Sequence, residues 1–209
     1  DTKNNSSAIL LAKDNGIIAG IELANYIFNE VDSKLNIKSN FRDGNTVNKG
    51  DIIMNISGNT QSILKAERLV LNCMQQMSAI ATKTNNISKK ISSTNTKILD
   101  TRKTIPLNRK IQKWAVKIGG GKNHRFALDD MIMIKDNHID YCGGITQAIK
   151  KTKIYLKQNN LNLDIVVETR NIKEIKEVIN EGGIKRILLD NFNFDDTRNA
   201  VKIIDNKFE

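Results

Sequence analysis

The sequence predicts an α/β protein in which a small α+β domain precedes a domain built on a parallel sheet. Two observations support this prediction. Short apolar runs separated by turn signals fill residues 8–66, whereas apolar strands alternate regularly with amphipathic helices from residue 97 onward. A long amphipathic helix over residues 60–91 stands between the two patterns. We therefore expect domains at 1–66 and 67–209, with this helix as their link.

The first domain is expected to be a small antiparallel sheet with one helix. Asn-Gly supports the positive φ of a tight turn, so the apolar runs on either side of Asp14-Asn15-Gly16 predict a hairpin over residues 8–20. Helical spacing of apolar residues predicts a helix over 21–31. The other elements expected here are strands at 35–41 and 51–56 and a turn at Arg42-Asp43-Gly44.

The linking helix is expected to bury one apolar stripe. We read its methionines as core-filling residues, because a flexible thioether adapts to irregular packing. The predicted stripe consists of Ile63, Leu64, Leu69, Val70, Leu71, Met74 and Met77. Taken by itself, Arg68 reads as a solvated cation at the edge of this stripe.

The second domain is expected to form a parallel sheet with right-handed crossovers, because its strands alternate with helices. Its strands are continuous apolar runs, which is typical of strands covered on both faces. The expected strands are 97–99, 131–134, 163–167 and 186–189, and the expected helices are 107–118, 145–157, 172–181 and 195–204. Four such units cannot close an eight-stranded barrel, which takes about 250 residues.

Charged side chains stand just beyond each predicted strand, where parallel sheets bind ligands. These side chains are Asp100 with Arg102 and Lys103, then Lys135 with Asp136, then Glu168, and then Asp190. The motif segments add one further cation, Arg125, with His124 beside it. Clustered cations suit a polyanionic substrate, while carboxylates suit Mg²⁺ or sugar hydroxyls. The combination predicts a site for a phosphorylated sugar and an acid.

Two features of this region have alternative readings. The Gly119-Gly120-Gly121 run could cradle a phosphate with its backbone N–H groups, or it could end a helix and form a turn. His138 could act as an acid or base, although a structural hydrogen bond at a strand end is the simpler reading. Familiar nucleotide and zinc motifs are absent from the sequence.

Composition excludes some broad classes of function. No apolar run approaches the roughly 20 residues that span a bilayer, and the polar start lacks a secretory signal. Two cysteines without metal-type spacing indicate a reducing, cytoplasmic location. The net charge of +10 raises the possibility of nucleic-acid binding, but aromatic residues make up only 5% and carboxylates share the predicted rim. We therefore expect neither nucleic-acid nor membrane partners.

Seven ordered segments resemble the motifs of the quinolinate phosphoribosyltransferase family, the carboxylating nicotinate-nucleotide pyrophosphorylases of NAD synthesis. They are Glu67-Arg68-x-x-Leu71-Asn72, Ser78-Ala79-Ile80-Ala81-Thr82, Asp100-Thr101-Arg102-Lys103-Thr104, Gly119-Gly120-Gly121-Lys122-Asn123-His124-Arg125, Ile134-Lys135-Asp136-Asn137-His138, Val167-Glu168 and Leu189-Asp190-Asn191. The resemblance implies an N-terminal α+β sandwich domain followed by an incomplete TIM-like α/β barrel. It also implies that quinolinate and phosphoribosyl pyrophosphate (PRPP) react to nicotinate mononucleotide, pyrophosphate and CO₂, with Mg²⁺.

The resemblance also implies roles for individual residues. Arg102, His124, Arg125 and Lys135 would bind the quinolinate carboxylates, Lys103 and Lys135 would lie near the phosphoribosyl and pyrophosphate groups, and Glu168 and Asp190 would hold ribose hydroxyls and the metal, directly or through water. The catalytic set would be Lys103, Lys135, Glu168 and Asp190. Arg68 would reach the neighbouring active site of a homodimer.

This sequence departs from the family pattern at two places. Ile105-Pro106-Leu107 replaces the usual Thr-Pro-Gly, and the glycine-rich segments that bind the 5′-phosphate would lie beyond Glu209. We therefore expect a chain truncated at both ends, with the last barrel strands missing. Two related enzymes remain as alternatives, a phosphoribosyltransferase that uses nicotinate and a molybdenum-linked paralogue. The set of Arg102, Arg125 and Lys135 favours a dicarboxylate over either.

Overall fold

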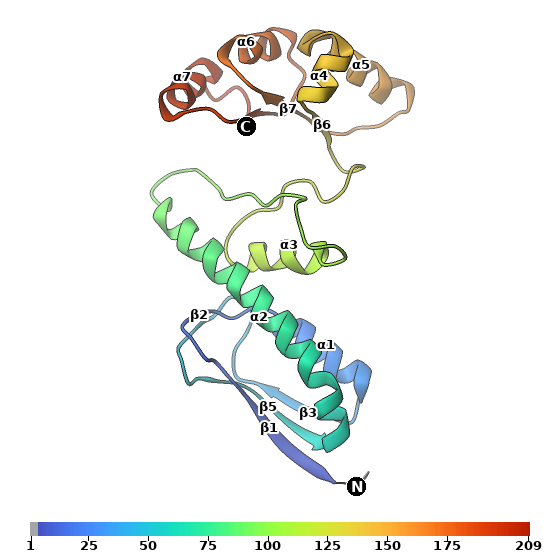
Figure 1. The fold of residues 1–209 in the computed structure, drawn as a ribbon, viewed down its shortest axis with the longest axis vertical. Coiled ribbons are helices and arrows are strands. Elements are labelled where there is room, and N and C mark those ends of the chain that lie inside the picture. The colour runs from blue at the N-terminus through green and yellow to red at the C-terminus, as the bar shows by residue number, and fades with distance from the viewer. Residues whose placement is uncertain (1–3) are drawn as a thin grey trace. The chain divides into compact units, whose positions relative to one another are not determined.

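The computed structural model describes residues 4–209, and Asp1 to Lys3 of the polar start lie outside the described residues. The chain forms two compact units, one ending at His124 and the other beginning at Arg125 (Figure 1). Each unit is described by itself below. The domain boundary expected after residue 66 stays a prediction. Among the described residues, no helix combines the length and apolar character needed to cross a bilayer.

A three-stranded antiparallel sheet forms the base of the first unit, as predicted. Its strand order is β1 (Asn5–Leu11), β5 (Ile52–Asn59) and β3 (Asn36–Ser39). Helices α1 (Ile21–Val31) and α2 (Thr60–Lys90) contribute to the same core. Its fully buried residues include Ala24, Ile53, Met54, Ala66 and Val70.

The predicted hairpin over residues 8–20 is wrong. β1 pairs with β5, and the short strand β2 (Gly16–Ile17) pairs instead with β4 (Thr46–Val47). The backbone N–H of Ile17 donates to Thr82 Oγ1 of α2 at 2.9 Å. Gly16 is not among the residues with positive φ. The chain between β1 and β2 thus finds its partners in segments distant in sequence, and the local Asn-Gly signal does not decide the pairing.

The predicted turn at residues 42–44 is confirmed, and Asp43 links it to α1. Its Oδ1 accepts hydrogen bonds from the backbone N–H groups of Gly20 at 2.6 Å and Ile21 at 2.9 Å. Gly44 has a φ of 91°. Because Gly20 has no side chain to cap α1, Asp43 supplies the acceptor from more than twenty residues away.

Helix α2 begins at the predicted residue, capped by Asn59, whose side chain accepts from the N–H groups of Gln61 and Ser62. Its methionines are core residues as expected, with Met74 and Met77 at most 3% exposed. The prediction that Leu64 and Leu69 belong to the buried stripe is wrong. Leu64 and Leu69 are 62% and 55% exposed, because the buried face runs instead through Ile63, Ala66, Val70 and Met74.

The strand predicted at residues 97–99 is also wrong. The structure has only an isolated parallel bridge between Leu99 and Lys122 at this point. Helix α3 (Arg109–Ile118) follows and packs on α2, and its Ala115 belongs to a core that also contains Ile17, Ala19, Met77 and Ala81. This region therefore belongs to the first unit and adds no strand to the parallel sheet.

The second unit contains the predicted parallel sheet. Its strands, in spatial order, are β6 (Ile132–Ile134), β7 (Ile165–Thr169) and β8 (Arg186–Leu189). Helices α5 (Ile145–Gln158), α6 (Ile172–Glu181) and α7 (Phe194–Ile204) confirm the predicted alternation. Figure 1 shows the helices arrayed along one side of these strands. The core between them includes Ile149, Val167, Ile175 and Val178.

An additional short helix, α4 (Asp136–Cys142), follows β6 directly. The sequence does not predict this helix, because Asp136-Asn137-His138 is typical of a polar loop and seven residues are too few to show helical periodicity. Its first turn is closed by a hydrogen bond from the N–H of Lys135 to His138 Nδ1 at 3.0 Å. The structural reading of His138 is therefore supported, although the residue lies in a helix and not at a strand end.

Candidate functional site

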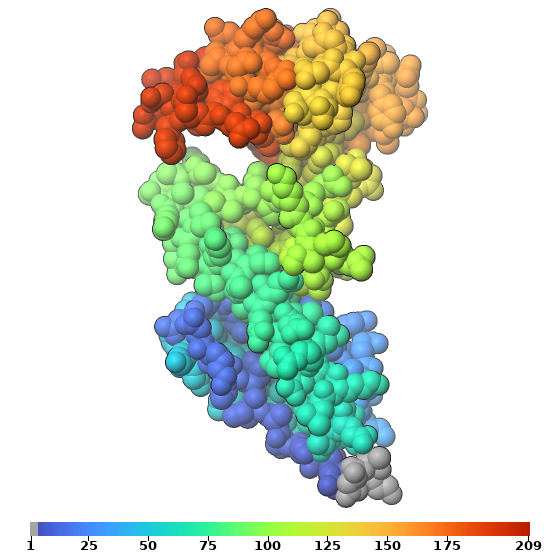
Figure 2. Space-filling model, viewed as in Figure 1, coloured from blue at the N-terminus to red at the C-terminus, as the bar shows by residue number. Residues whose placement is uncertain are grey.

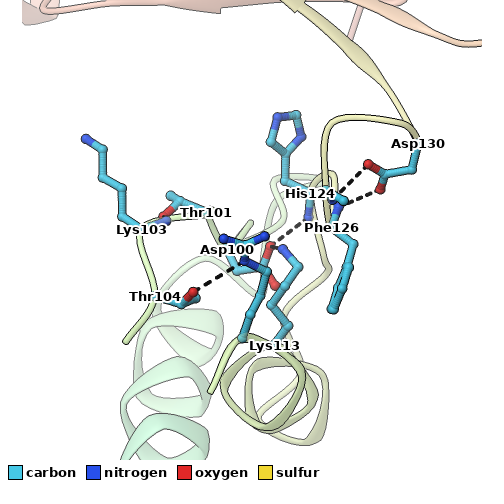
Figure 3. Close-up of polar contacts among 10 residues, drawn as sticks. Asp100, Thr101, Lys103, Thr104, Lys113, His124, Phe126 and Asp130 are labelled. Atoms are coloured by element: carbon cyan, nitrogen blue, oxygen red, sulfur yellow. Dashed lines mark hydrogen bonds and ion pairs between the residues drawn. The ribbon is translucent and has the colours of Figure 1, made fainter. Parts of the chain in front are cut away.

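Asp100 is a buried structural anion in the first unit. It forms an ion pair with Lys113 of α3, and the two side chains are 6% and 2% exposed. Its Oδ1 also accepts a hydrogen bond from the backbone N–H of His124 at 2.9 Å (Figure 3). Asp100, which the sequence places among the anions beyond the predicted strands, is therefore already paired with the cation of Lys113.

Asn123 completes the surroundings of Asp100. With its amide nitrogen turned inward, the orientation that satisfies both amide atoms, it donates to Asp100 Oδ2 at 2.8 Å and to Lys113 O at 2.9 Å. The backbone N–H of Lys122 donates to Ile98 O at 2.8 Å. Hydrogen bonds thus join residues 122–124, which include His124, to residues 98–100, which precede Arg102 and Lys103.

The three glycines form the end of α3 and do not cradle an anion. Gly120 has a φ of 90°, and the N–H groups of Gly119, Gly120 and Gly121 all donate to carbonyl oxygens of α3 at 3.0 Å. This pattern is the Schellman type of helix end. A Cβ atom on Gly119 would lie 2.4 Å from Ala81 O, so this glycine also lets α3 approach α2 closely. Of the two readings, the helix cap is correct.

Arg102, Lys103 and His124 come from the two segments that Asp100 joins. Lys103 is exposed, whereas Arg102 and His124 are half-buried. Figure 3 shows the Lys103 ammonium and the His124 ring extending away from Asp100. Arg102 Nε is buried and has no hydrogen-bond partner among the described residues. A buried donor without a partner costs about 1–3 kcal/mol, so a bound anion at Arg102 would relieve a real penalty.

The departure at Ile105-Pro106-Leu107 has a visible consequence. Leu107 stands where the family that the sequence resembles usually has glycine. It adopts a φ of 65°, and its side chain is fully exposed. A leucine in this left-handed conformation costs about 1–2 kcal/mol, which glycine would not. The turn thus keeps a conformation suited to glycine in the absence of one.

We predict that Leu107→Gly raises the free energy of unfolding by about 0.5–1 kcal/mol, since the relief of strain exceeds the extra freedom that glycine gives the unfolded chain. Urea denaturation measures the change. Leu107→Ala is the matched control, because it removes the same exposed side chain and keeps the strain. Equal stability of the two variants would mean that strain at Leu107 is negligible.

In the second unit, Arg125 begins a loop that is organised by Asp130. The Asp130 carboxylate accepts hydrogen bonds from the backbone N–H groups of Phe126 and Ala127. Burial raises the pKa of Asp130, but these hydrogen bonds and Arg125 outweigh it, so that the pKa lies below its usual value. Arg125 itself donates to Met131 O at 3.3 Å. The loop before β6 is therefore held in a defined conformation.

Lys135 and Glu168 meet at the carboxyl ends of β6 and β7. The Lys135 Nζ lies 3.6 Å from Glu168 Oε2, and the two side chains are 43% and 12% exposed. Lys135 is the residue between β6 and α4, as predicted for a strand end. Glu168 lies within β7, one residue before its end, so the expected end of this strand at residue 167 is too early.

Asp190 follows β8 directly and extends the same edge of the sheet. Its N–H donates to Thr169 O at 2.9 Å, and its Oδ2 accepts from Asn191 Nδ2 at 2.9 Å. The parallel register pairs Glu168 with Leu188 and Thr169 with Leu189. Lys135, Glu168 and Asp190 thus stand at one edge of three neighbouring strands, which is where ligands bind in sheets of this kind.

The two carboxylates are the candidate metal ligands. Among residues 4–209 no group of three or more His, Cys, Asp or Glu side chains could hold a metal ion. Mg²⁺ usually binds proteins through one or two carboxylates and takes its other oxygens from water and substrate phosphates. The pair of Glu168 and Asp190 fits that kind of site and does not fit a metal held by protein alone.

Arg68 is exposed on α2, and the exposed Leu64 and Leu69 lie beside it on the helix. Figure 2 shows the first turns of α2, in teal, at the surface of the unit.

Lys113 and Asn123 also shape the site, although the sequence does not single them out as site residues. Asn123 lies within one of the family motifs, whereas Lys113 has no sequence signal, because a lysine on a helix is indistinguishable from a solvated cation until its buried carboxylate partner is located.

Family models match nearly the whole chain. The model of the quinolinate phosphoribosyl transferase N-terminal domain matches residues 1–78, and that of the C-terminal domain matches residues 80–209. A chloroplastic "nicotinate-nucleotide pyrophosphorylase [carboxylating]" of Arabidopsis thaliana is 46% identical over 97% of this chain and 62% of its own length. A mitochondrial "quinolinate phosphoribosyltransferase [decarboxylating] 2b" of Nicotiana tabacum is 49% identical over 89% and 54%.

Solved structures show the same fold. NadC from Streptococcus pyogenes matches with a TM-score of 0.93 and 32% identity, over 100% of this chain and 73% of that one. The nicotinate-nucleotide pyrophosphorylase from Francisella tularensis matches with a TM-score of 0.92 and 38% identity, over 100% and 72%. The chain therefore spans roughly half to three-fifths of the length of the curated relatives named above.

Proposed function

The chain belongs to the quinolinate phosphoribosyl transferase family, and from this premise we propose that the protein transfers a phosphoribosyl group from PRPP to quinolinate with decarboxylation. The products are nicotinate mononucleotide, pyrophosphate and CO₂, in the synthesis of NAD. The observation that carries this proposal is the placement of Lys135, Glu168 and Asp190 at the ends of three neighbouring parallel strands. A cation and two carboxylates at one edge suit an anionic, sugar-containing substrate pair.

In this proposal, cationic side chains recognise the acid. Arg102, His124, Arg125 and Lys135 bind the two carboxylates of quinolinate. The partnerless Nε of Arg102 supports its part in this, because a carboxylate would supply the missing acceptor. Arginine forms paired hydrogen bonds to a carboxylate, whereas lysine acts as a point charge that can also serve a phosphate. Lys103 and Lys135 accordingly neutralise the phosphoribosyl and pyrophosphate groups.

The carboxylates serve the reacting sugar. Breaking the bond between C1 and pyrophosphate leaves positive charge on C1, which Glu168 and Asp190 stabilise while they hold the ribose hydroxyls. The pyridine nitrogen then forms the new bond to C1. Its positive charge draws electrons into the ring, so that the neighbouring carboxylate leaves as CO₂ and the ring carbon takes a proton. Positioning and charge complementarity are the protein's main contributions.

Mg²⁺ would be held by Glu168 and Asp190, directly or through water, and would supply charge neutralisation for the departing pyrophosphate. The ammonium of Lys135 lies 3.6 Å from Glu168 Oε2 and balances part of the same negative charge.

The finer features of the fold and assembly belong to the same proposal. We propose that β6, β7 and β8 are part of an incomplete TIM-like barrel, and that the protein acts as a homodimer in the cytoplasm. Arg68 would enter the partner's active site. Its exposure between Leu64 and Leu69 supports this, because apolar side chains left exposed on a helix are suited to covering by another chain.

The test is an assay of the intact protein with quinolinate, PRPP and Mg²⁺, following nicotinate mononucleotide and CO₂ release together. We expect both products in equal amounts, and little product when nicotinate replaces quinolinate. Equal or faster turnover of nicotinate would instead assign the protein to the related nicotinate-using enzymes. Omission of Mg²⁺ should abolish product formation, and equal activity without it would remove the metal from the proposal.

A further inference from the structure

Arg170 connects helices α4 and α6 of the second unit, close in sequence to Glu168 of the proposed site. It lies two residues after Glu168 and binds Asp140 of α4 through two guanidinium nitrogens, at 3.1 and 3.2 Å. It also binds Glu174 of α6, with its closest nitrogen 2.7 Å from Oε1. These hydrogen bonds, to Glu174 first and then to Asp140, raise the pKa of Arg170 above its usual value. One side chain thus joins α4 to the junction of β7 and α6.

Glu174, one of the two partners of Arg170, is itself held in place by burial and by backbone hydrogen bonds. Glu174 is buried, and its Oε2 accepts the backbone N–H of Arg170 at 2.7 Å. Asn171 Oδ1 in turn accepts the N–H of Glu174 at 3.0 Å and caps α6. Arg170 is therefore anchored to the chain that follows β7, and its remaining donors are directed at Asp140.

Helix α4, which Arg170 contacts through Asp140, is hydrogen-bonded to the backbone of Lys135. The carbonyl of Lys135 accepts the N–H of Ile139 at 2.9 Å, and its N–H donates to His138. Because both backbone groups of Lys135 are bound to the first turns of α4, a shift of this helix moves Lys135 with it. Glu168, the partner of the Lys135 ammonium, belongs to β7 on the other side of the Arg170 contact.

We propose that the Arg170–Asp140 pair is a positioning clamp that fixes α4 against β7 and α6, so that Lys135 stays opposite Glu168. This inference rests on the proposed function of Lys135 and Glu168. Arg170 and Asp140 are positioning residues, since neither is among the groups that contact substrate in that function. An exposed ion pair of this kind contributes little to stability, so its loss should change the geometry of the site more than the folding of the unit.

Asp140→Asn is the decisive variant, because it weakens the hold on α4 and leaves the Arg170–Glu174 contact in place. In the intact protein we expect quinolinate affinity, measured by titration calorimetry, to fall about fivefold. Amide hydrogen exchange within α4 should become faster, while the urea midpoint stays unchanged. Arg170→Gln should show the same effects, and Arg170→Lys a smaller loss. Arg198→Gln is the control, because Arg198 makes an exposed ion pair with Asp195 within α7.

A second measurement separates positioning from general loosening. If the clamp acts through Lys135, Arg170→Gln should cause no further loss of quinolinate affinity in a Lys135→Ala protein, whereas independent losses would overturn the inference. Unchanged exchange in α4 of Asp140→Asn would also overturn it. If the unaltered protein binds no quinolinate, the proposed function fails, and the exchange measurement still decides whether the clamp holds α4.

Discussion

Replacing Lys113 with methionine is expected to lower the free energy of unfolding by about 3–5 kcal/mol. The ammonium of Lys113 is the cation that balances Asp100 in a site where both side chains are almost wholly buried. Methionine fills a similar volume but leaves a buried carboxylate without its ion-pair partner. The remaining donors, His124 N–H and the Asn123 amide, cannot replace a full positive charge. Urea denaturation of the variant and the unaltered protein measures the loss.

Two further variants make this prediction specific. Lys110→Met removes an exposed lysine from the same helix and should change stability by less than about 0.5 kcal/mol. Adding Asp100→Asn to Lys113→Met should recover part of the loss, because it removes the unbalanced charge and keeps an acceptor for the His124 N–H. If Lys113→Met is no less stable than Lys110→Met, Asp100 does not depend on its ion pair.

Replacing Lys135 with alanine should weaken quinolinate binding by about 10- to 100-fold, the loss expected for one charge-assisted contact. The variant removes the ammonium that lies 3.6 Å from Glu168 Oε2, so quinolinate would meet a carboxylate whose charge this lysine no longer balances. Because Lys135 is 43% exposed, the fold should remain intact. Titration calorimetry with quinolinate measures the affinity in the intact protein.

The matched control is Lys151→Ala, which removes an exposed lysine from α5 and should leave affinity unchanged. Arg102→Ala should show a loss comparable to that of Lys135→Ala, because it removes the guanidinium proposed to bind a carboxylate. Near-normal affinity in both variants would reject the assignment of the acid-binding residues and leave the fold untouched.

Much of the second unit could be predicted from the sequence. Strands that alternate with helices must run parallel, and parallel strands present their carboxyl ends at one edge. Lys135, Glu168 and Asp190 were predicted at that edge for this reason, and the structure brings them there. The first unit was predicted less well, because antiparallel pairing depends on contacts between distant segments. The local Asn-Gly signal predicted a hairpin, whereas β1 pairs with β5 across some forty residues.

From residue 131 onward, the periodicity of the sequence and the direction of the strands are enough to predict the parallel sheet, its alternation with the helices α5 to α7 and the charged residues at its edge. The role of each charge, in contrast, depends on contacts that form only when the chain folds. Asp100 and Glu168 both follow or end an apolar run in the sequence. In the structure, Asp100 forms an ion pair with the buried Lys113, whereas Glu168 is paired with Lys135, whose side chain is 43% exposed. The charge that a side chain offers a ligand depends on neighbours brought close by folding, and no local pattern records them.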